Sequence, residues 1–355
     1  MTENYNKLAK ILVNYSTKVK KGEKVMIHMI EPESLPLISE IYKEVVKAGG
    51  FAEVYFSSVY FTRSLLQFGN LAQISYQTPV ENFGIEQADV WIGIRAIRNP
   101  YELKDSNTKK LNLYNKVVGD TAHKRVEGTR WVIARVPTEA FAQQAEMSLE
   151  QAMQFYFSST LVDWAKEALK WKKWMAAFQQ AETVRIIGHE TDLSLSTKGR
   201  KYVLAGGQYN MPDGEFFTAP VETSVEGKIF YEFPSQKSGK VVRNIRLEFK
   251  KGAIVKATAT ENEDVLLETI ATDKGSKYLG ELGIGTNYGI DRFVMETLFD
   301  EKIGGTIHTA IGRAYTENKG TNQSAVHWDL VKDLRSEGQI LLDGKKIFEN
   351  GKFLI

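Results

Sequence analysis

The chain has 355 residues, 43% of them hydrophobic, which is enough for two domains with sizeable cores and excludes a small scaffold or wholesale disorder. Its 46 Lys and Arg against 44 Asp and Glu give a formal net charge of +2, so the composition shows no electrostatic footprint for nucleic acid or an anionic membrane. The absence of cysteine excludes disulfides, thiolate metal ligands, iron–sulfur clusters and a cysteine nucleophile. The polar start of the chain lacks an apolar signal core, and no stretch approaches the roughly 18 apolar residues of a membrane span. We therefore expect a cytoplasmic globular protein.

The first 140 residues alternate between strand and helix patterns. Four apolar runs are typical of strands, namely residues 24–30, 52–56, 88–94 and 131–136. Between the first two, Ser34 can cap a helix that stops at Gly49. This strand–helix–strand spacing indicates a parallel βαβ unit, so the amino-terminal part is predicted to be α/β.

The turn after the first predicted strand argues against a dinucleotide site. Such folds place G-x-G-x-x-G directly after the strand. This chain has Glu31-Pro32-Glu33-Ser34 there, with no glycine and with two acidic groups where a phosphate would lie. The motif G-x-x-x-x-G-K-[ST] is also absent. We therefore expect no nucleotide cofactor.

The middle of the chain predicts a change of architecture. Ser148 and Gln151 form a capping box for a helical stretch that runs to about Ala181, and its aromatic stripe favours packing against a core. Beyond residue 183, short strand-like runs with Asp-Gly and Asn-Gly turns replace most helices. The expected fold class is α/β, with a parallel-sheet α/β domain over residues 1–180 and a mixed domain rich in antiparallel strands over residues 181–355.

Metal-ligand residue types gather in four short segments between residues 210 and 329. His327 and Asp329 are two residues apart, so a strand would point both side chains to one face, where they suit a zinc- or iron-type cation. An ordinary His–Asp hydrogen bond explains that pair as well. Glu301 and His308 bracket two glycines, which allow a loop to bring both ends to one point. A surface turn beside a core histidine is the alternative.

Two further carboxylates stand in apolar surroundings. Glu215 precedes two phenylalanines, and Glu281 lies within a glycine-rich apolar run. A carboxylate in such a place is costly unless a cation compensates it, and that cation is either a metal or an Arg or Lys side chain.

The candidate ligands together supply four negative charges and two neutral imidazoles: Glu215, Glu281, Glu301, His308, His327 and Asp329. Two divalent ions roughly 3.5–4 Å apart, sharing a carboxylate and a water, suit such a set. The metalloprotease motif H-E-x-x-H and the serine elbow G-x-S-x-G are both absent.

Four motifs follow one another in these segments: N-M-P-D-G-E-F-F-T-A-P, G-E-L-G-I-G-T-N, F-D-E-K-x-x-G-T-x-H-x-A-x-G-x-A-Y and N-x-S-x-x-H-W-D. In this order they resemble the M29 family of metallo-aminopeptidases, the aminopeptidase T and aminopeptidase S group, and the similarity extends over the whole chain. The resemblance implies an α/β amino-terminal domain, a homodimer, and a dinuclear site in the carboxy-terminal domain held by the six residues above.

The resemblance also implies individual roles. Glu281 matches the central carboxylate, which bridges the metals or handles the proton of a bridging water. Tyr315 matches a tyrosine near the metals, whose phenol can donate to an oxyanion, although a packed loop aromatic is the alternative. The interval from Glu301 to His308 is longer than in other members, so Glu296 is retained as an alternative ligand.

The expected function is release of amino-terminal residues from peptides by metal-activated water, with Zn²⁺, Co²⁺, Mn²⁺ or Mg²⁺ fitting the donors equally well. Contact of the substrate's free α-amine with a metal or carboxylate would make the enzyme an exopeptidase. One rival hypothesis is a mononuclear non-haem iron ring-cleaving dioxygenase of related fold that uses His308, His327 and Asp329. Another is a non-catalytic, metal-stabilised or peptide-binding dimer. The presence of Glu215 and Glu281 in addition to the iron-type triad favours a two-metal hydrolase over a mononuclear dioxygenase.

Overall fold

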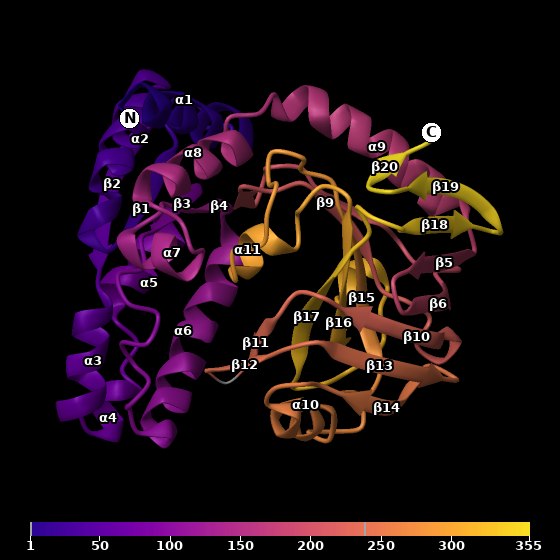
Figure 1. Cartoon of the computed structure of the whole chain (residues 1–355). Coiled ribbons are helices and arrows are strands. Elements are labelled where there is room, and N and C mark those ends of the chain that lie inside the picture. The colour runs from indigo at the N-terminus through magenta and orange to yellow at the C-terminus, as the bar shows by residue number, and fades with distance from the viewer. Residues whose placement is uncertain (1, 238) are drawn as a thin grey trace. The chain divides into compact units, whose positions relative to one another are not determined.

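The computed structural model describes residues 2–237 and 239–355, and the chain divides into two compact units (Figure 1). The first contains the described residues up to Leu161 together with Gly207–Pro212, and the second contains Val162–Gly206 and Asp213–Ile355. Among the described residues, no helix is both long and apolar enough to cross a membrane.

The first unit is built on a parallel sheet whose strand order is β2-β1-β3-β4-β8. Its strands are β1 (Lys24–Ile30), β2 (Phe51–Ser57), β3 (Val90–Arg95), β4 (Arg130–Arg135) and β8 (Asn210–Met211). The four predicted strands are confirmed to within two residues at each end. The short strand β8 was not predicted, because it has only two residues and comes from a distant part of the chain that joins this sheet beside β4.

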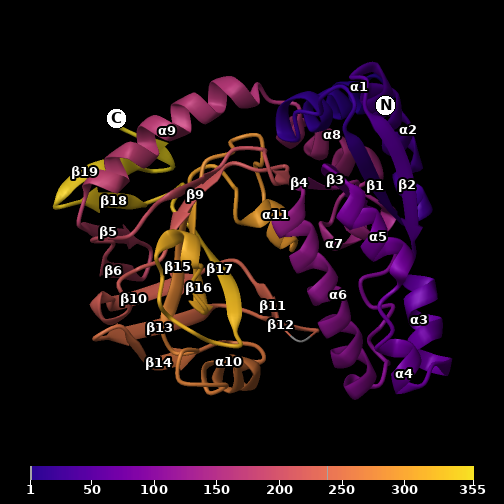
Figure 2. The ribbon, with the colours of Figure 1, turned by 180° about the vertical axis from the view of Figure 1, so that it is seen from behind.

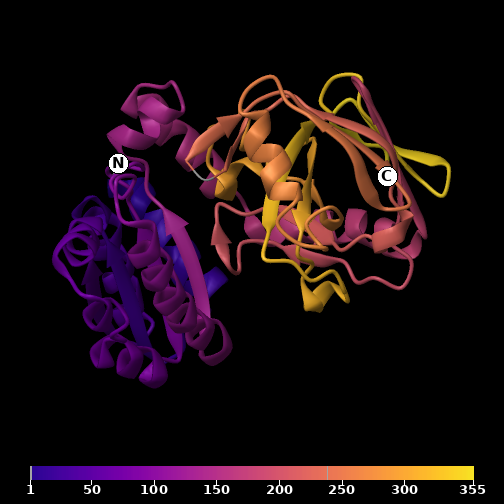
Figure 3. The ribbon, with the colours of Figure 1, turned by 90° about the horizontal axis from the view of Figure 1, so that it is seen from below.

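Helices cover both faces of this sheet (Figure 3). Helix α2 packs on β1 and β2, whereas α5 contacts β1 and α6 contacts β4. The crossovers from β1 to β2 and from β2 to β3 run in opposite directions, and right-handed connections therefore place their helices on opposite faces. The helical elements are α1 (Thr2–Lys10), η1 (Ile11–Ser16), η2 (Pro32–Ser34), α2 (Leu35–Lys47), α3 (Val59–Phe68), α4 (Leu71–Ile74), α5 (Pro79–Gln87), α6 (Thr108–Gly128), α7 (Glu139–Gln144) and α8 (Leu149–Thr160).

The long helical stretch predicted from Ser148 is two helices, α8 and α9 (Trp164–Gln180). The capping box of Ser148 and Gln151 is present at the start of α8. The stretch breaks because the Asp163 side chain accepts a hydrogen bond from the backbone N–H of Lys166 at 3.1 Å and so caps a new helix.

The predicted domain boundary near residue 180 also differs from the structure, which places α9 in the second unit. Helix α9 packs on β7 (Val203–Ala205) and β9 (Glu215–Thr218), where the rings of Phe178 and Phe216 lie 5.0 Å apart between centroids. Burial of its aromatic face therefore ties this helix to the strands that follow it.

The second unit contains two larger antiparallel sheets, as predicted for this half of the chain. One has the order β17-β16-β15-β9-β7, with β15 (Leu279–Gly285), β16 (Thr306–Gly312) and β17 (His327–Asp333) at its centre and edge (Figure 2). The other has the order β14-β13-β10-β6-β5-β18-β19-β20. Its strands are β5 (Thr183–Gly188), β6 (Thr191–Ser196), β10 (Glu226–Tyr231), β13 (Ile245–Lys250), β14 (Ala253–Thr258), β18 (Gln339–Leu342), β19 (Lys345–Glu349) and β20 (Lys352–Phe353).

Smaller elements complete this unit. Strands β11 (Ser235–Lys237) and β12 (Lys240–Val242) pair with each other, and the helical segments are η3 (Glu222–Ser224), α10 (Glu263–Ile270), α11 (Thr297–Asp300) and η4 (Thr316–Asn318). The strand structure breaks between β12 and β13, where Asn244 adopts a left-handed backbone conformation with φ of +53°.

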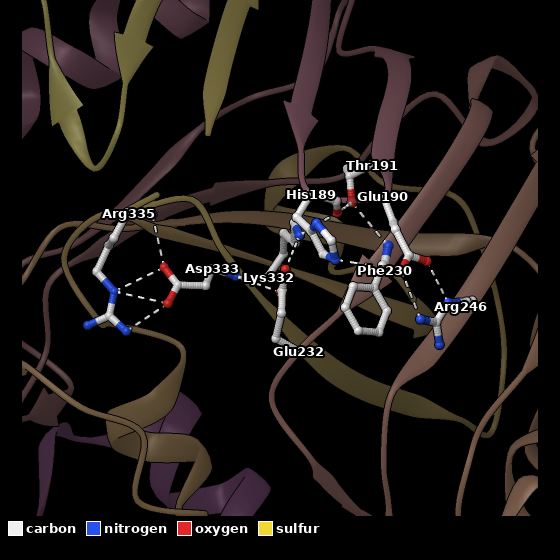
Figure 4. Close-up of polar contacts among 9 residues, drawn as sticks. All are labelled: His189, Glu190, Thr191, Phe230, Glu232, Arg246, Lys332, Asp333 and Arg335. Atoms are coloured by element: carbon white, nitrogen blue, oxygen red, sulfur yellow. Dashed lines mark hydrogen bonds and ion pairs between the residues drawn. The ribbon is translucent and has the colours of Figure 1, made fainter. Parts of the chain in front are cut away.

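A buried lysine fixes β17, which carries two of the predicted ligands (Figure 4). Lys332 is inaccessible to solvent, and its ammonium contacts the carboxylate of Glu232 and donates to the backbone carbonyl of His189 at 3.0 Å. Next to it, Arg335 forms a paired hydrogen bond with Asp333. Because an unpaired buried ammonium would be strongly destabilising, these contacts hold β17 against β10 and the β5–β6 turn.

Candidate metal centre

The strand register of the second unit brings most of the predicted ligands to one face of a sheet. His308 of β16 lies opposite Gly283 of β15, and Asp329 of β17 lies opposite Ala310. Directly opposed residues of antiparallel strands point to the same side, as do residues two apart on one strand. The side chains that share this face are therefore those of Glu215, Glu281, His308, His327 and Asp329.

Small residues leave room between these side chains. Gly283, Ala310 and Gly312 stand opposite His308, Asp329 and His327 respectively. A Cβ atom on Gly283 would lie only 1.9 Å from Cε1 of His308, so the imidazole occupies the space that a side chain would need. Gly283 of the G-E-L-G-I-G segment is thus part of the site.

Three of the predicted ligands form the centre of the cluster. His308 Nε2 lies 3.0 Å from Glu281 Oε1 and 3.3 Å from Glu215 Oε2, and one ligand atom from each of the three lies within 4.8 Å of the others. The Oε2 atoms of Glu215 and Glu281 are buried and have no hydrogen-bond partner among the described residues. Buried carboxylate oxygens that accept no hydrogen bond are costly, and a divalent cation would satisfy them. The donor set therefore fits a metal ion.

The backbone orients both histidines for this role. Nδ1 of His308 lies 3.2 Å from the carbonyl oxygen of Glu301, and Nδ1 of His327 lies 2.8 Å from that of Arg313. Donation from Nδ1 to these carbonyls leaves Nε2 of each ring as the atom that would bind a metal once it has lost its proton. The loop between Glu301 and His308 thus folds back on itself, as its glycines predicted.

The remaining predicted ligands lie beside this centre. His327 Nε2 is 3.8 Å from Glu281 Oε2 and 3.4 Å from Asp329 Oδ1, and Glu301 and Asp329 line the same cavity. Glu301, at the end of α11, is the acid that joins the group. The alternative, Glu296, stands at the start of α11, where its backbone N–H donates to Asp300 at 2.6 Å. The structure thus brings all six predicted residues together.

The sequence patterns missed a lysine in the middle of the site. The Lys302 side chain is 2% exposed, and its Nζ lies 3.1 Å from Glu215 Oε1 and 2.7 Å from Glu301 Oε2. Burial opposes its charge, but the carboxylates keep the pKa of Lys302 well above its ordinary value. Burial likewise raises the pKa of Glu301 to about 8, with Lys302 acting in the opposite direction. The lysine partner that the sequence left open for Glu215 is therefore Lys302.

Nothing in the sequence separates Lys302 from an exposed lysine except its place in F-D-E-K, directly before an apolar, glycine-rich run. Asp213 was missed as well, although it is buried and its charge acts on Lys302.

The excess of buried carboxylates changes the protonation of the site. Burial disfavours the charged form of His308, but the hydrogen bond with Glu281 and the charge of Glu215 raise its pKa to about 10. For His327, burial is again outweighed, here by Asp329, and the pKa is about 9. Burial also raises the pKa of Glu281. Without a metal, the two imidazoles therefore carry protons that a divalent cation would replace.

Tyr315 lies at the margin of the cluster. Its ring centroid is 5.0 Å from that of His327, and the side chain is 38% exposed. Burial and the neighbouring carboxylates raise the pKa of Tyr315 above its ordinary value, so the phenol remains a hydrogen-bond donor. A cavity of about 160 Å³ adjoins the site, and its lining includes Phe293, Glu301 and Asp329.

Comparison with known proteins places this geometry in a family. The model of the thermophilic metalloproteases (M29) matches residues 1–353. Aminopeptidase AmpS from Bacillus subtilis strain 168 is 27% identical over 72% of this chain and 74% of its own length, and aminopeptidase PepS from Streptococcus thermophilus is 26% identical over 99% and 98%.

Two solved structures share the fold over the full chain. Wild-type AmpT from Thermus thermophilus has a TM-score of 0.86 at 20% identity and covers 99% of both chains. The 2,5-dihydroxypyridine dioxygenase from Pseudomonas putida KT2440 has a TM-score of 0.64 at 14% identity, covering 100% of this chain and 98% of its own. These likenesses confirm the predicted fold class.

The family match also confirms the predicted enzyme class, a hydrolase of the metallo-aminopeptidase type, and it implies a divalent metal. With a match that spans residues 1–353, the chain belongs to the thermophilic metalloprotease family M29.

Proposed function

We propose that this protein removes amino-terminal residues from peptides and that it holds two divalent ions with Glu215, Glu281, Glu301, His308, His327 and Asp329. The observation that carries the proposal is the pair of buried carboxylate oxygens, Glu215 Oε2 and Glu281 Oε2, which lack hydrogen-bond partners beside His308. The names of the relatives AmpS and PepS, both aminopeptidases, support the reaction class.

Glu281 is the central carboxylate of the proposed donor set. Its two oxygens face different histidines, with Oε1 3.0 Å from His308 and Oε2 3.8 Å from His327. When bound, the ions would supply a Lewis acid for the peptide carbonyl and lower the pKa of a water molecule. Burial raises the pKa of Glu281, so this carboxylate would hold a proton from the attacking water and pass it to the leaving amine.

The surrounding residues would select and stabilise the substrate. Tyr315, which stays protonated, would donate to the oxyanion that develops at the carbonyl. The cavity of about 160 Å³ beside Glu301 and Asp329 would accept the free α-ammonium group of a peptide. A carboxylate-lined cavity of this size favours a small cationic group and makes the enzyme an exopeptidase.

The oligomeric state and the cellular location are proposed from the family match alone. The donors suit Zn²⁺, Co²⁺, Mn²⁺ and Mg²⁺, so we propose no single physiological metal. We also propose a homodimer that acts in the cytoplasm on peptides with a free amino terminus.

The dioxygenase remains the second candidate, because its fold is similar and because His308, His327 and Asp329 have the composition of an iron-binding triad. Two observations disfavour it: His308 contacts Glu281 and Glu215, and Lys302 bridges Glu215 and Glu301. A mononuclear iron site has no use for this number of buried carboxylates.

The test is hydrolysis of leucine p-nitroanilide by chelator-treated protein, with Co²⁺, Zn²⁺, Mn²⁺ or Mg²⁺ added back and the N-acetylated substrate run in parallel. We expect metal-restored activity on the free amine only. Aerobic, Fe²⁺-dependent cleavage of a dihydroxypyridine ring would support the dioxygenase instead. Metal-dependent melting without either reaction would indicate a non-catalytic protein and would contradict the proposal.

A further inference from the structure

A second cavity lies within the first unit, separate from the metal centre. It has a volume of about 490 Å³, and its lining includes the last residues of three neighbouring strands, Ile30, Ser57 and Arg95, together with side chains of α3 to α6. The strand order places β1 between β2 and β3, and the crossovers leave β1 and β2 in opposite directions. In open parallel sheets, ligands bind at the carboxyl ends of strands where the order reverses in this way.

Two arginines give the cavity a positive charge. Arg95 is exposed at the end of β3, and Arg125 projects from α6 over the rings of Trp91 and Trp131, at 4.4 and 4.8 Å from their centroids. Neither guanidinium forms an ion pair or a hydrogen bond with another described residue, and Nε of Arg125 is buried without a partner. Burial and the charge of Arg95 lower the pKa of Arg125 to about 10. Two like charges kept together without a counter-ion point to an anionic ligand.

The other titratable groups do not cancel this charge. His28 Nε2 lies 2.8 Å from Ser57 Oγ, and burial together with the two arginines lowers the pKa of His28 to about 4, so the ring is neutral near pH 7. Among the described residues of the lining, Glu81 is the one carboxylate, and it acts on Tyr55 rather than pairing with an arginine.

The rest of the lining is largely apolar, with Phe56, Phe61, Leu65, Ile74 and Val117. No glycine-rich turn follows β1 in the sequence, and no glycine is among the described residues that line the cavity, so these residues do not form the backbone cradle typical of phosphate sites. We propose that this cavity binds a small organic carboxylate with an aromatic or branched apolar group, and that the carboxylate contacts Arg95 and Arg125. The volume is within the range of roughly 300–1,000 Å³ typical of small-molecule sites.

Calorimetric titration of the chelator-treated full chain tests the proposal without interference from metal-bound carboxylates. The probes are 3-phenylpropionate, 3-phenylpropylamine, which lacks the anion, and inorganic phosphate, which lacks the apolar group. We expect measurable binding of the first alone at concentrations up to about 10 mM. The substitutions Arg95→Gln and Arg125→Gln should each weaken it by about tenfold or more, since each removes a charged hydrogen-bond donor. Lys116→Gln, an equal charge change on the exposed side of α6, should leave binding unchanged.

A third variant separates loss of the site from loss of the fold. Thr121 also lines the cavity and lies one helical turn before Arg125, so Thr121→Glu supplies an internal carboxylate for the guanidinium. This variant should abolish binding of 3-phenylpropionate while raising the melting temperature. The proposal is overturned if wild-type protein does not bind the probe, if the arginine variants or Thr121→Glu bind it as tightly as wild type, or if phosphate binds equally well.

Discussion

The two units of this chain bury opposite charges and handle them differently. In the second unit, carboxylates from three antiparallel strands and a loop meet on one sheet face, where Lys302 and two histidines partly balance them. In the first unit, Arg95 at the end of β3 and Arg125 on α6 line one cavity, with no acidic partner among the described residues. A site with surplus negative charge suits a cation, and a site with surplus positive charge suits an anion. The chemistry of each unit can therefore be inferred from the charge that its own residues leave unbalanced.

The largest effect is expected at the carboxylate shared by both histidines of the metal centre. Glu281→Gln should lower turnover of leucine p-nitroanilide by about a thousandfold or more, because it removes a charge and the proposed proton carrier together. Steady-state assays with added Co²⁺ measure this. Glu268→Gln, an exposed acid on α10, is the matched control. Activity of Glu281→Gln within threefold of wild type would disprove this role.

Adding a methyl group at Gly283 tests whether the His308 imidazole needs the space that this glycine leaves. Gly283→Ala puts a Cβ atom 1.9 Å from the imidazole, so the ring has to move. We expect activity to fall by about a hundredfold and stability by about 1–3 kcal/mol. The control is Gly119→Ala, where a Cβ atom meets nothing within 4 Å. Similar behaviour of the two variants in activity and in urea unfolding would show that the contact is unimportant.

Replacing Lys302 tests how much its ammonium group contributes to the stability of the metal-free protein by pairing with buried carboxylates. Lys302→Met leaves Glu215 and Glu301 without their ion-pair partner, and breaking a buried pair costs about 3–5 kcal/mol. Urea unfolding with chelator should show this loss, and added Zn²⁺ should stabilise the variant more than wild type. Equal stability of the two proteins in chelator would mean that Lys302 does not balance the site.

The smallest effect concerns the neutral histidine of the first unit. Burial and the two arginines lower the pKa of His28 to about 4, below the unfolded value near 6.5, so the unfolded state binds the proton first as the pH falls. This contribution to stability is complete above pH 6.5 and is lost as the pH falls towards 4.

The unfolding free energy of the wild type should therefore fall between pH 7.5 and pH 5. For His28→Gln, this fall should be smaller by about 2 kcal/mol. Arg125→Gln should reduce that difference, because it removes one of the charges that oppose protonation. A pH dependence that His28→Gln leaves unchanged would contradict this assignment.

The same comparison shows what the sequence was able to predict. Local patterns found β1 to β4 and the capping box of α8, because short-range apolar periodicity and side-chain caps determine such elements. The candidate ligands were chosen because four motifs in order resemble one family, and because acids in apolar runs are unusual. The break at Asp163 was missed, although Asp before an aromatic run is a capping signal.

Long-range placement was beyond these patterns. The charge of Lys302 and the unpaired state of Arg125 depend on which side chains the fold brings near them, and their sequence neighbours do not reveal this. The position of α9 likewise depends on its contacts with β7 and β9. Strand β7 begins more than twenty residues after α9 ends, so these contacts cannot be seen in the local sequence.

We propose above that the buried carboxylates and histidines of the second unit hold catalytic metal. Equilibrium dialysis of chelator-treated protein against Co²⁺, followed by metal analysis and by the leucine p-nitroanilide assay on the same samples, tests it most directly. We expect about two ions per chain and activity that rises with metal occupancy. Absence of bound cobalt in folded protein, or full occupancy without hydrolysis of the free-amine substrate, would contradict it.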